Sequence, residues 1–99
     1  MRADEAYRGL RDGRLALVDV REDRELRDVR IDGAIHLPLS RLPQHLDELP
    51  SGLPVAFFCR SGRRAAIAAG VARRAGIDAY NIRGGLLAWR ADDLPLRLG

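Results

Sequence analysis

Apolar positions along the chain alternate between the spacing of an amphipathic helix and that of a short buried strand. Near the N-terminus, four apolar residues recur at intervals of three and four: Ala3, Ala6, Tyr7 and Leu10. This spacing predicts one face of a helix, which Gly13 ends. Residues 15–18 are then apolar without interruption, which predicts a short buried strand.

The rest of the chain repeats this alternation. Further strands are expected at residues 33–37, 54–58 and 77–82. Further helices are expected at residues 23–29, 40–49, 64–75 and 84–89. Ser40 is expected to cap the second of these helices, with Pro43 in its first turn. Gly76 is expected to end the third.

Strands that alternate with helices at such short spacing imply right-handed βαβ units. We therefore expect an α/β fold in which a small parallel β-sheet is flanked by helices on both faces. The sheet should have about four strands, with room for a fifth short strand at an edge. A chain of 99 residues, 46% of them hydrophobic and 31% charged, fits a single domain over residues 1–99.

Composition narrows the possible partners. The net charge is only +3, there is no lysine and aromatic residues are few, so we expect no nucleic-acid partner. Outside the strand at residues 54–58, the longest apolar stretch is residues 65–72, far short of the roughly 18 residues that span a bilayer. The first residues turn acidic at once, unlike a secretory signal. These features predict a soluble, cytoplasmic protein with no membrane partner.

Polar and glycine-rich stretches follow several of the predicted strands. In parallel sheets, ligands bind beyond the carboxyl ends of the strands. Three stretches should meet at that edge: residues 19–22, the loop that begins at Cys59, and residues 83–85. Asp19 and Arg21, in the first of these, are expected to pair with neighbouring loops and shape a pocket.

The loop reads CRSGRR over residues 59–64 and contains the only cysteine of the chain. A loop between a strand and a helix points backbone N–H groups at one place, and the helix dipole adds to their field. Such a pocket favours an anion and favours the reactive thiolate of Cys59. Gly62 allows the tight curvature that this needs.

Two arginines, Arg63 and Arg64, lie where the next helix is expected to begin. Cations in the first turn of a helix are unfavourable by about 0.3–1 kcal/mol each, and a bound anion would remove the conflict. The sequence therefore predicts Cys59 as the catalytic nucleophile. The predicted substrate-binding residues are Arg60, Ser61, Gly62, Arg63 and Arg64.

Simpler interpretations of these residues exist. A lone cysteine after an apolar strand is more often inert core, and the arginines could be a solvated basic face. A solvated face, however, does not need a cysteine and a glycine at its centre. His36 and His45 have no second ligand at metal-binding spacing, so no metal site is expected.

The length of the loop discriminates between two kinds of cysteine enzyme. Cysteine phosphatases place an arginine after five intervening residues, and here that position is Ala65. The loop ends one residue earlier, at Arg64. A smaller loop suits a smaller transferred atom, namely sulfur.

Four motifs in order cover nearly the whole chain: LVDVRE (17–22), IDGAIHLPL (31–39), VAFFCRSGRRAAIAA (55–69) and NIRGGLLAW (81–89). With these motifs the sequence resembles a single-domain rhodanese, a thiosulfate sulfurtransferase-like protein. The chain departs from many relatives at residues 29–31, where it has Val-Arg-Ile in place of Gly-His-Ile. It also lacks the short edge strand that often precedes the first helix.

The resemblance implies a rhodanese-like fold and a sulfur-transfer reaction. Cys59 would attack the outer sulfur of thiosulfate or a persulfide donor, and the loop amides would cradle the resulting persulfide. A thiol or cyanide would accept the sulfur. The family requires no metal or organic cofactor.

Another class of function stays open. The domain could be a non-catalytic or relay module that binds a partner protein, such as a sulfur acceptor, through its arginine-rich loop rim. An inactive relative would be expected to lack the cysteine, whereas this chain retains Cys59.

Overall fold

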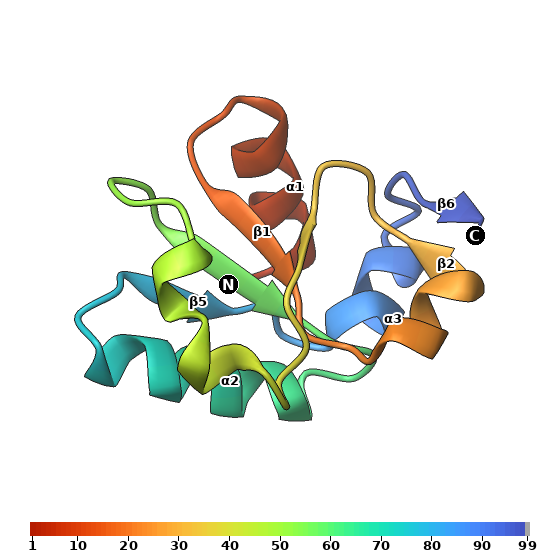
Figure 1. Cartoon of the computed structure of the whole chain (residues 1–99). Coiled ribbons are helices and arrows are strands. Elements are labelled where there is room, and N and C mark those ends of the chain that lie inside the picture. Colours follow the sequence, from red (N-terminus) through yellow and green to blue (C-terminus); the bar gives the residue numbers. More distant parts are fainter. Residues whose placement is uncertain (99) are drawn as a thin grey trace.

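Four short parallel strands form the centre of the protein (Figure 1). The computed structural model of the chain describes residues 1–98. From edge to edge the strands are β3 (Ile35–His36), β1 (Ala16–Asp19), β4 (Val55–Phe58) and β5 (Ala79–Asn81). Val18 of β1 lies opposite Ile35 on one side and Phe57 on the other, and Phe57 of β4 also lies opposite Asn81, so β1 and β4 are the two central strands.

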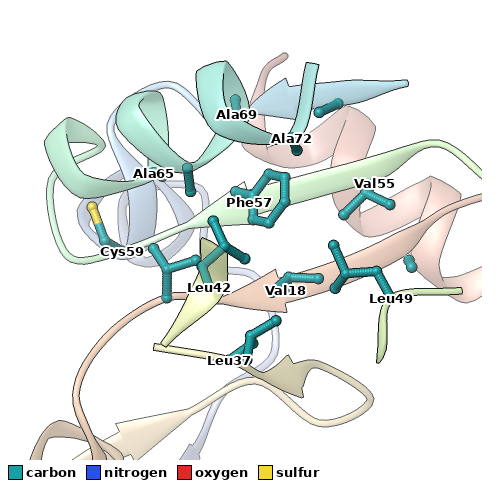
Figure 2. Packing of buried hydrophobic residues seen from close by; sticks show 14 residues of the cluster. Val18, Leu37, Leu42, Leu49, Val55, Phe57, Cys59, Ala65, Ala69 and Ala72 are labelled. Carbon is teal, nitrogen blue, oxygen red and sulfur yellow. The ribbon is translucent and has the colours of Figure 1, made fainter. Parts of the chain in front are cut away.

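The two central strands are buried over their whole length, which explains why β4 is wholly apolar and why β1 is apolar up to its last residue, Asp19. Successive side chains point to opposite faces. Val18, Val55 and Phe57 belong to one core cluster, shown in Figure 2, whereas Leu17 and Phe58 belong to the other. The sheet therefore separates two small apolar cores.

Helices cover both faces, as the sequence predicted (Figure 1). Helix α2 (Arg63–Arg74) packs its alanines on the first cluster, and Ala65, Ala68 and Ala72 are fully buried there. Helices α1 (Ala3–Arg11) and α3 (Gly85–Ala91) cover the second cluster. The predicted α/β class is confirmed. Within residues 1–98, no helix is long and apolar enough to cross a membrane.

The prediction of a helix at residues 40–49 is wrong. Two separate 3-10 segments, η2 (Leu42–Gln44) and η3 (Leu46–Glu48), replace it. Between them His45 has φ −128°, outside the helical region, so no continuous helix forms. Ser40 caps nothing; its hydroxyl donates to the Glu22 carboxylate at 3.2 Å.

The segment at residues 23–29 also differs from the expected helix. It forms the 3-10 segment η1 (Asp23–Arg27) and then the strand β2 (Val29–Arg30), which pairs antiparallel with β6 (Arg97–Leu98) near the C-terminus (Figure 1). The Arg97 guanidinium clamps the Asp32 carboxylate beside this ribbon, with N–O distances of 2.6 and 3.1 Å. Two-residue strands carry no periodicity, so the sequence did not reveal this pairing.

Candidate active site

Cys59 follows the last residue of β4 and lies beside the first turn of α2 (Figure 2). Only 1% of the residue is exposed, yet its sulfur is not merely packed in the core. The backbone N–H of Gly62 donates to the sulfur at 3.1 Å. An N–H donor aimed at sulfur stabilises negative charge on it, as a reactive thiolate needs.

Gly62 makes this contact possible through its backbone. It is the N-cap of α2 and has φ +104°, a conformation that L side chains rarely adopt. A Cβ at this position would lie 3.3 Å from the backbone nitrogen of Gly84. The loop from Cys59 therefore packs directly on the turn that begins α3.

The first turn of α3 donates hydrogen bonds to backbone carbonyl groups of the Cys59 loop. The N–H of Leu86 donates to the carbonyl oxygen of Cys59 at 2.8 Å, and that of Leu87 donates to the carbonyl oxygen of Arg60 at 3.1 Å. These donors would otherwise be unpaired at the start of a helix. Because N–H and C=O groups point in opposite directions across a trans peptide, the N–H groups of Arg60 and Ser61 point away from α3.

Gly85 is where the loop and α3 come closest. A Cβ there would lie 2.9 Å from the carbonyl oxygen of Arg60 and closer still to that of Cys59. Only glycine fits. The sequence predicted that the glycine pair begins a helix. It did not predict that Gly85 packs against the Cys59 loop, because that contact joins residues 26 positions apart.

Arg64 has a counter-charge within the protein. Its Nη1 and Nη2 groups donate to the two carboxylate oxygens of Glu25 in η1, at 2.7 and 2.9 Å. The hydrogen bonds from Arg64 lower the pKa of Glu25 from its ordinary 4.5 to about 2, and Glu25 in turn raises the pKa of Arg64. Sequence reasoning missed Glu25, since 39 positions separate it from Arg64.

Arg60 and Arg63 differ from Arg64. Both are exposed, and within residues 1–98 neither forms an ion pair. Ser61 between them is also exposed. Arg60 lines a hollow of about 140 Å³ together with Leu87 of α3 and Glu25 of η1. Arg60, in the Cys59 loop, and Arg63, at the start of α2, are thus open to solvent.

Asp19 and Arg21 were expected to pair with neighbouring loops, and here the structure differs in part. They pair with each other: Arg21 Nη2 lies 2.8 Å from Asp19 Oδ2, with both side chains only 3% exposed. Arg21 also donates to the carbonyl oxygen of Val29 at 2.7 Å. The pair therefore ties the end of β1 to the segment that carries Glu25, and Arg21 lines the same hollow as Arg60.

The two histidines lie outside the loop. His36 Nε2 is 2.7 Å from the carbonyl oxygen of Arg21 and can donate to it, while His45 contacts Glu48 on the surface. In the described part of the chain, no three side chains of His, Cys, Asp or Glu are grouped to hold a metal ion. Ala65, where a phosphatase would carry its arginine, is fully buried in the core.

Taken together, these contacts form a loop that can stabilise negative charge on the Cys59 sulfur. The buried sulfur accepts the N–H of Gly62, the N-cap of α2, and the neighbouring residues Arg60 and Arg63 are exposed. This arrangement suits nucleophilic attack by sulfur on an anionic substrate.

Comparison with known proteins agrees with this geometry. A family model described as the Rhodanese-like domain matches residues 2–92. A protein of Allochromatium vinosum named Sulfurtransferase is 35% identical over 81 residues, which cover 81% of this chain and 76% of that protein.

Solved structures are similar over almost the whole chain. A rhodanese-related protein from Thermoplasma volcanium has a TM-score of 0.91 at 26% identity, covering 100% of this chain and 97% of the other. A rhodanese-like domain protein from Staphylococcus aureus is 30% identical, with a TM-score of 0.80 and coverage of 90% and 91%.

Proposed function

Because the chain belongs to the rhodanese-like domain family, we propose that it moves a sulfane sulfur from a donor to a thiophilic acceptor through a persulfide on Cys59. The observation that carries this proposal is the 3.1 Å contact between the Gly62 N–H and the Cys59 sulfur. The donor is thiosulfate or a similar sulfane donor such as a persulfide. The acceptor is a thiol, or cyanide in an assay.

The proposed first step is a displacement at sulfur. The Cys59 thiolate forms a bond to the outer sulfur of thiosulfate, the sulfur–sulfur bond of thiosulfate breaks, and its electron pair leaves with sulfite. Charge is conserved, because a persulfide anion replaces the thiolate. The acceptor then attacks the outer sulfur of the persulfide, and the electron pair of that bond returns to Cys59.

Each loop residue has a proposed role. The Gly62 N–H and the neighbouring loop amides stabilise the thiolate and the persulfide. Arg60, Arg63 and Ser61 meet the incoming anion from the exposed rim, and Arg64 contributes its field within its ion pair.

Residues outside the Cys59 loop also have a proposed role. We propose that Asp19 and Arg21 shape the substrate pocket through their buried pair, since Arg21 lines the same hollow as Arg60. We propose that residues 1–99 work as one rhodanese domain. A persulfide cycle needs a free thiol, which the reducing cytoplasm maintains, so we place the protein there.

Mass spectrometry tests the intermediate directly. Incubation with excess thiosulfate should add one sulfur atom, about 32 mass units, because Cys59 is the only thiol. Cyanide should remove that atom and form thiocyanate. The Cys59→Ser variant should show neither change, and appreciable thiocyanate formation by this variant would refute the mechanism.

A relay role is the second candidate. Arg60 and Arg63 are exposed, and the 45% exposed Leu87 lies beside Arg60, a combination that suits a protein acceptor more than a small thiol. A persulfide that forms but resists cyanide and small thiols would favour the relay. Rapid turnover with cyanide would favour the enzyme.

A further inference from the structure

One of the three loop arginines is already engaged by a carboxylate. Both Nη groups of Arg64 face the two oxygens of Glu25, so the fork of the guanidinium that best matches an anionic donor is occupied. Arg64 lies two residues after Gly62, whose N–H contacts the Cys59 sulfur. Besides Glu25, Cys59 is among the groups whose interaction raises the pKa of Arg64, so Arg64 and its partner Glu25 lie near the sulfur at which an anionic donor would react.

Glu25 is held in this position by its own segment. Its Oε2 accepts the backbone N–H of Glu22 at 2.7 Å, and its backbone carbonyl oxygen accepts from Arg21 at 3.4 Å. Arg21 is in turn fixed by its buried pair with Asp19. The carboxylate is thus part of a built arrangement and is not a side chain that swings freely in solvent.

The pair is partly open to solvent, with 34% of the Arg64 side chain and 26% of the Glu25 side chain exposed. An approaching donor therefore senses both charges. A dianion is repelled by the Glu25 carboxylate twice as strongly as a monoanion, and a neutral donor is not repelled by it. Arg60 and Arg63 attract a dianion more strongly than a monoanion, and an unpaired Arg64 would add to this preference. Glu25 removes that addition because it cancels the charge of Arg64.

We propose that Glu25 is a specificity-determining residue: by neutralising Arg64, it weakens the preference of the Cys59 loop for dianionic over singly charged sulfane-sulfur donors. A singly charged donor, such as an organic persulfide or thiosulfonate, is therefore less disfavoured relative to thiosulfate than it would be beside an unpaired Arg64. This inference rests on the proposed persulfide chemistry of Cys59.

Two donors of different charge test the proposal on the full chain, with cyanide as acceptor. Thiosulfate carries two negative charges and methanethiosulfonate carries one. In each case Cys59 takes the outer sulfur, and sulfite or methanesulfinate leaves with the electron pair. The quantity measured is the ratio of kcat/KM for thiosulfate to kcat/KM for methanethiosulfonate, so the intrinsic reactivity of each donor cancels between variants.

The Glu25→Gln variant should raise this ratio about fivefold, the scale of one extra unit-charge interaction across several ångströms near a protein surface. Glutamine keeps an oxygen for the Glu22 N–H, so the local turn can persist. The Arg64→Gln variant should lower the ratio, because it leaves the carboxylate without its counter-charge. The double variant should return the ratio to within about twofold of the original, since both charges of the pair are gone.

Asp12 provides a matched control. Like Glu25, Asp12 is ion-paired, in its case with Arg11 and Arg14. It precedes the N-terminal end of β1, whereas Cys59 follows the C-terminal end of the parallel strand β4. Asp12→Asn changes the net charge by the same amount and should leave the ratio unchanged.

The outcomes separate the two proposals. An unchanged ratio in both Glu25→Gln and Arg64→Gln, or an equal shift in Asp12→Asn, would overturn the specificity role of Glu25. If Glu25→Gln does not fold, the comparison of the double variant with Arg64→Gln still decides, because these two proteins differ only in the charge at residue 25. Absence of a persulfide on the unaltered protein with either donor would refute the proposed function itself.

Discussion

Replacing Gly85 with alanine should disable the loop without touching any group that contacts the donor. The new methyl group would lie 2.9 Å from the carbonyl oxygen of Arg60 and even closer to that of Cys59. Both neighbours are backbone atoms, so no flexible side chain can move aside. The loop that carries Cys59 must shift away from α3.

The cost can be worked out from the contacts that this shift breaks. The hydrogen bonds from Leu86 to Cys59 and from Leu87 to Arg60 each contribute about 1 kcal/mol. Gly85 has φ +52°, and alanine in the left-handed region costs about 1 kcal/mol more. We therefore expect the free energy of unfolding to fall by about 2–4 kcal/mol.

Activity should fall further than stability explains. A displacement of about 1 Å in a catalytic group can cost on the order of 100-fold in rate, so kcat/KM for sulfur transfer should drop about 100-fold in protein that is still folded. The assay is thiocyanate formation from thiosulfate and cyanide, with urea unfolding measured in parallel. A kcat/KM within threefold of the original value would refute this account of Gly85.

Gly70 offers the matched control. It lies inside α2, and a Cβ there meets nothing within 4 Å. Gly70→Ala should therefore raise the free energy of unfolding by about 0.5–1 kcal/mol through helix propensity and leave activity unchanged. A loss of activity in this variant would show that the assay responds to any glycine replacement.

Three further predictions concern the charges and the length of the loop. At least one of Arg60→Gln and Arg63→Gln should lose about tenfold or more in kcat/KM for thiosulfate with unfolding free energy unchanged or slightly raised; parallel loss of activity and stability would make their role structural. For Arg64→Gln we expect the free energy of unfolding at neutral pH to fall by roughly 1–2 kcal/mol, because Glu25 loses its partner. This value is already reduced for the solvent exposure of the pair. Since the pKa of Glu25 is lowered from 4.5 to about 2 by folding, the pair stabilises the protein fully above about pH 4.5, and this contribution is lost as the pH falls toward 2. The free energy of unfolding, measured with urea, should thus differ less between pH 7 and pH 3 in Arg64→Gln than in the original protein. An equal difference in the two proteins would contradict a stabilising role of the Arg64–Glu25 pair. With Ala65 in place of a phosphatase arginine, aryl phosphates should be hydrolysed no faster than in buffer, and phosphate release that depends on Cys59 would contradict the sulfurtransferase assignment.

Local pattern was sufficient for the core elements of the fold. Residues 55–58 are apolar on both faces, which is the signature of a central parallel strand, and the structure buries all four. The alanine-rich stretch that ends before Gly76 predicted α2 within one residue at each end. Burial of apolar surface and helix periodicity act over neighbouring residues, so these features can be recognised without knowing the rest of the fold.

Local pattern failed where a segment had weak periodicity of its own. The helix expected at residues 40–49 became two 3-10 segments because the chain leaves the helical region at His45, and Ser40 found an acceptor in Glu22 instead of a helix end. The β2–β6 ribbon joins pairs of residues almost 70 positions apart, which no local pattern reports.

The candidate site divides in the same way. The sequence by itself placed Cys59, Gly62 and the arginines in one loop, because they are neighbours along the chain. Only the tertiary structure brought Glu25 to Arg64 and Gly85 against Cys59. Such contacts depend on how the strands and helices pack, and packing brings together residues whose spacing along the chain carries no information about the contact.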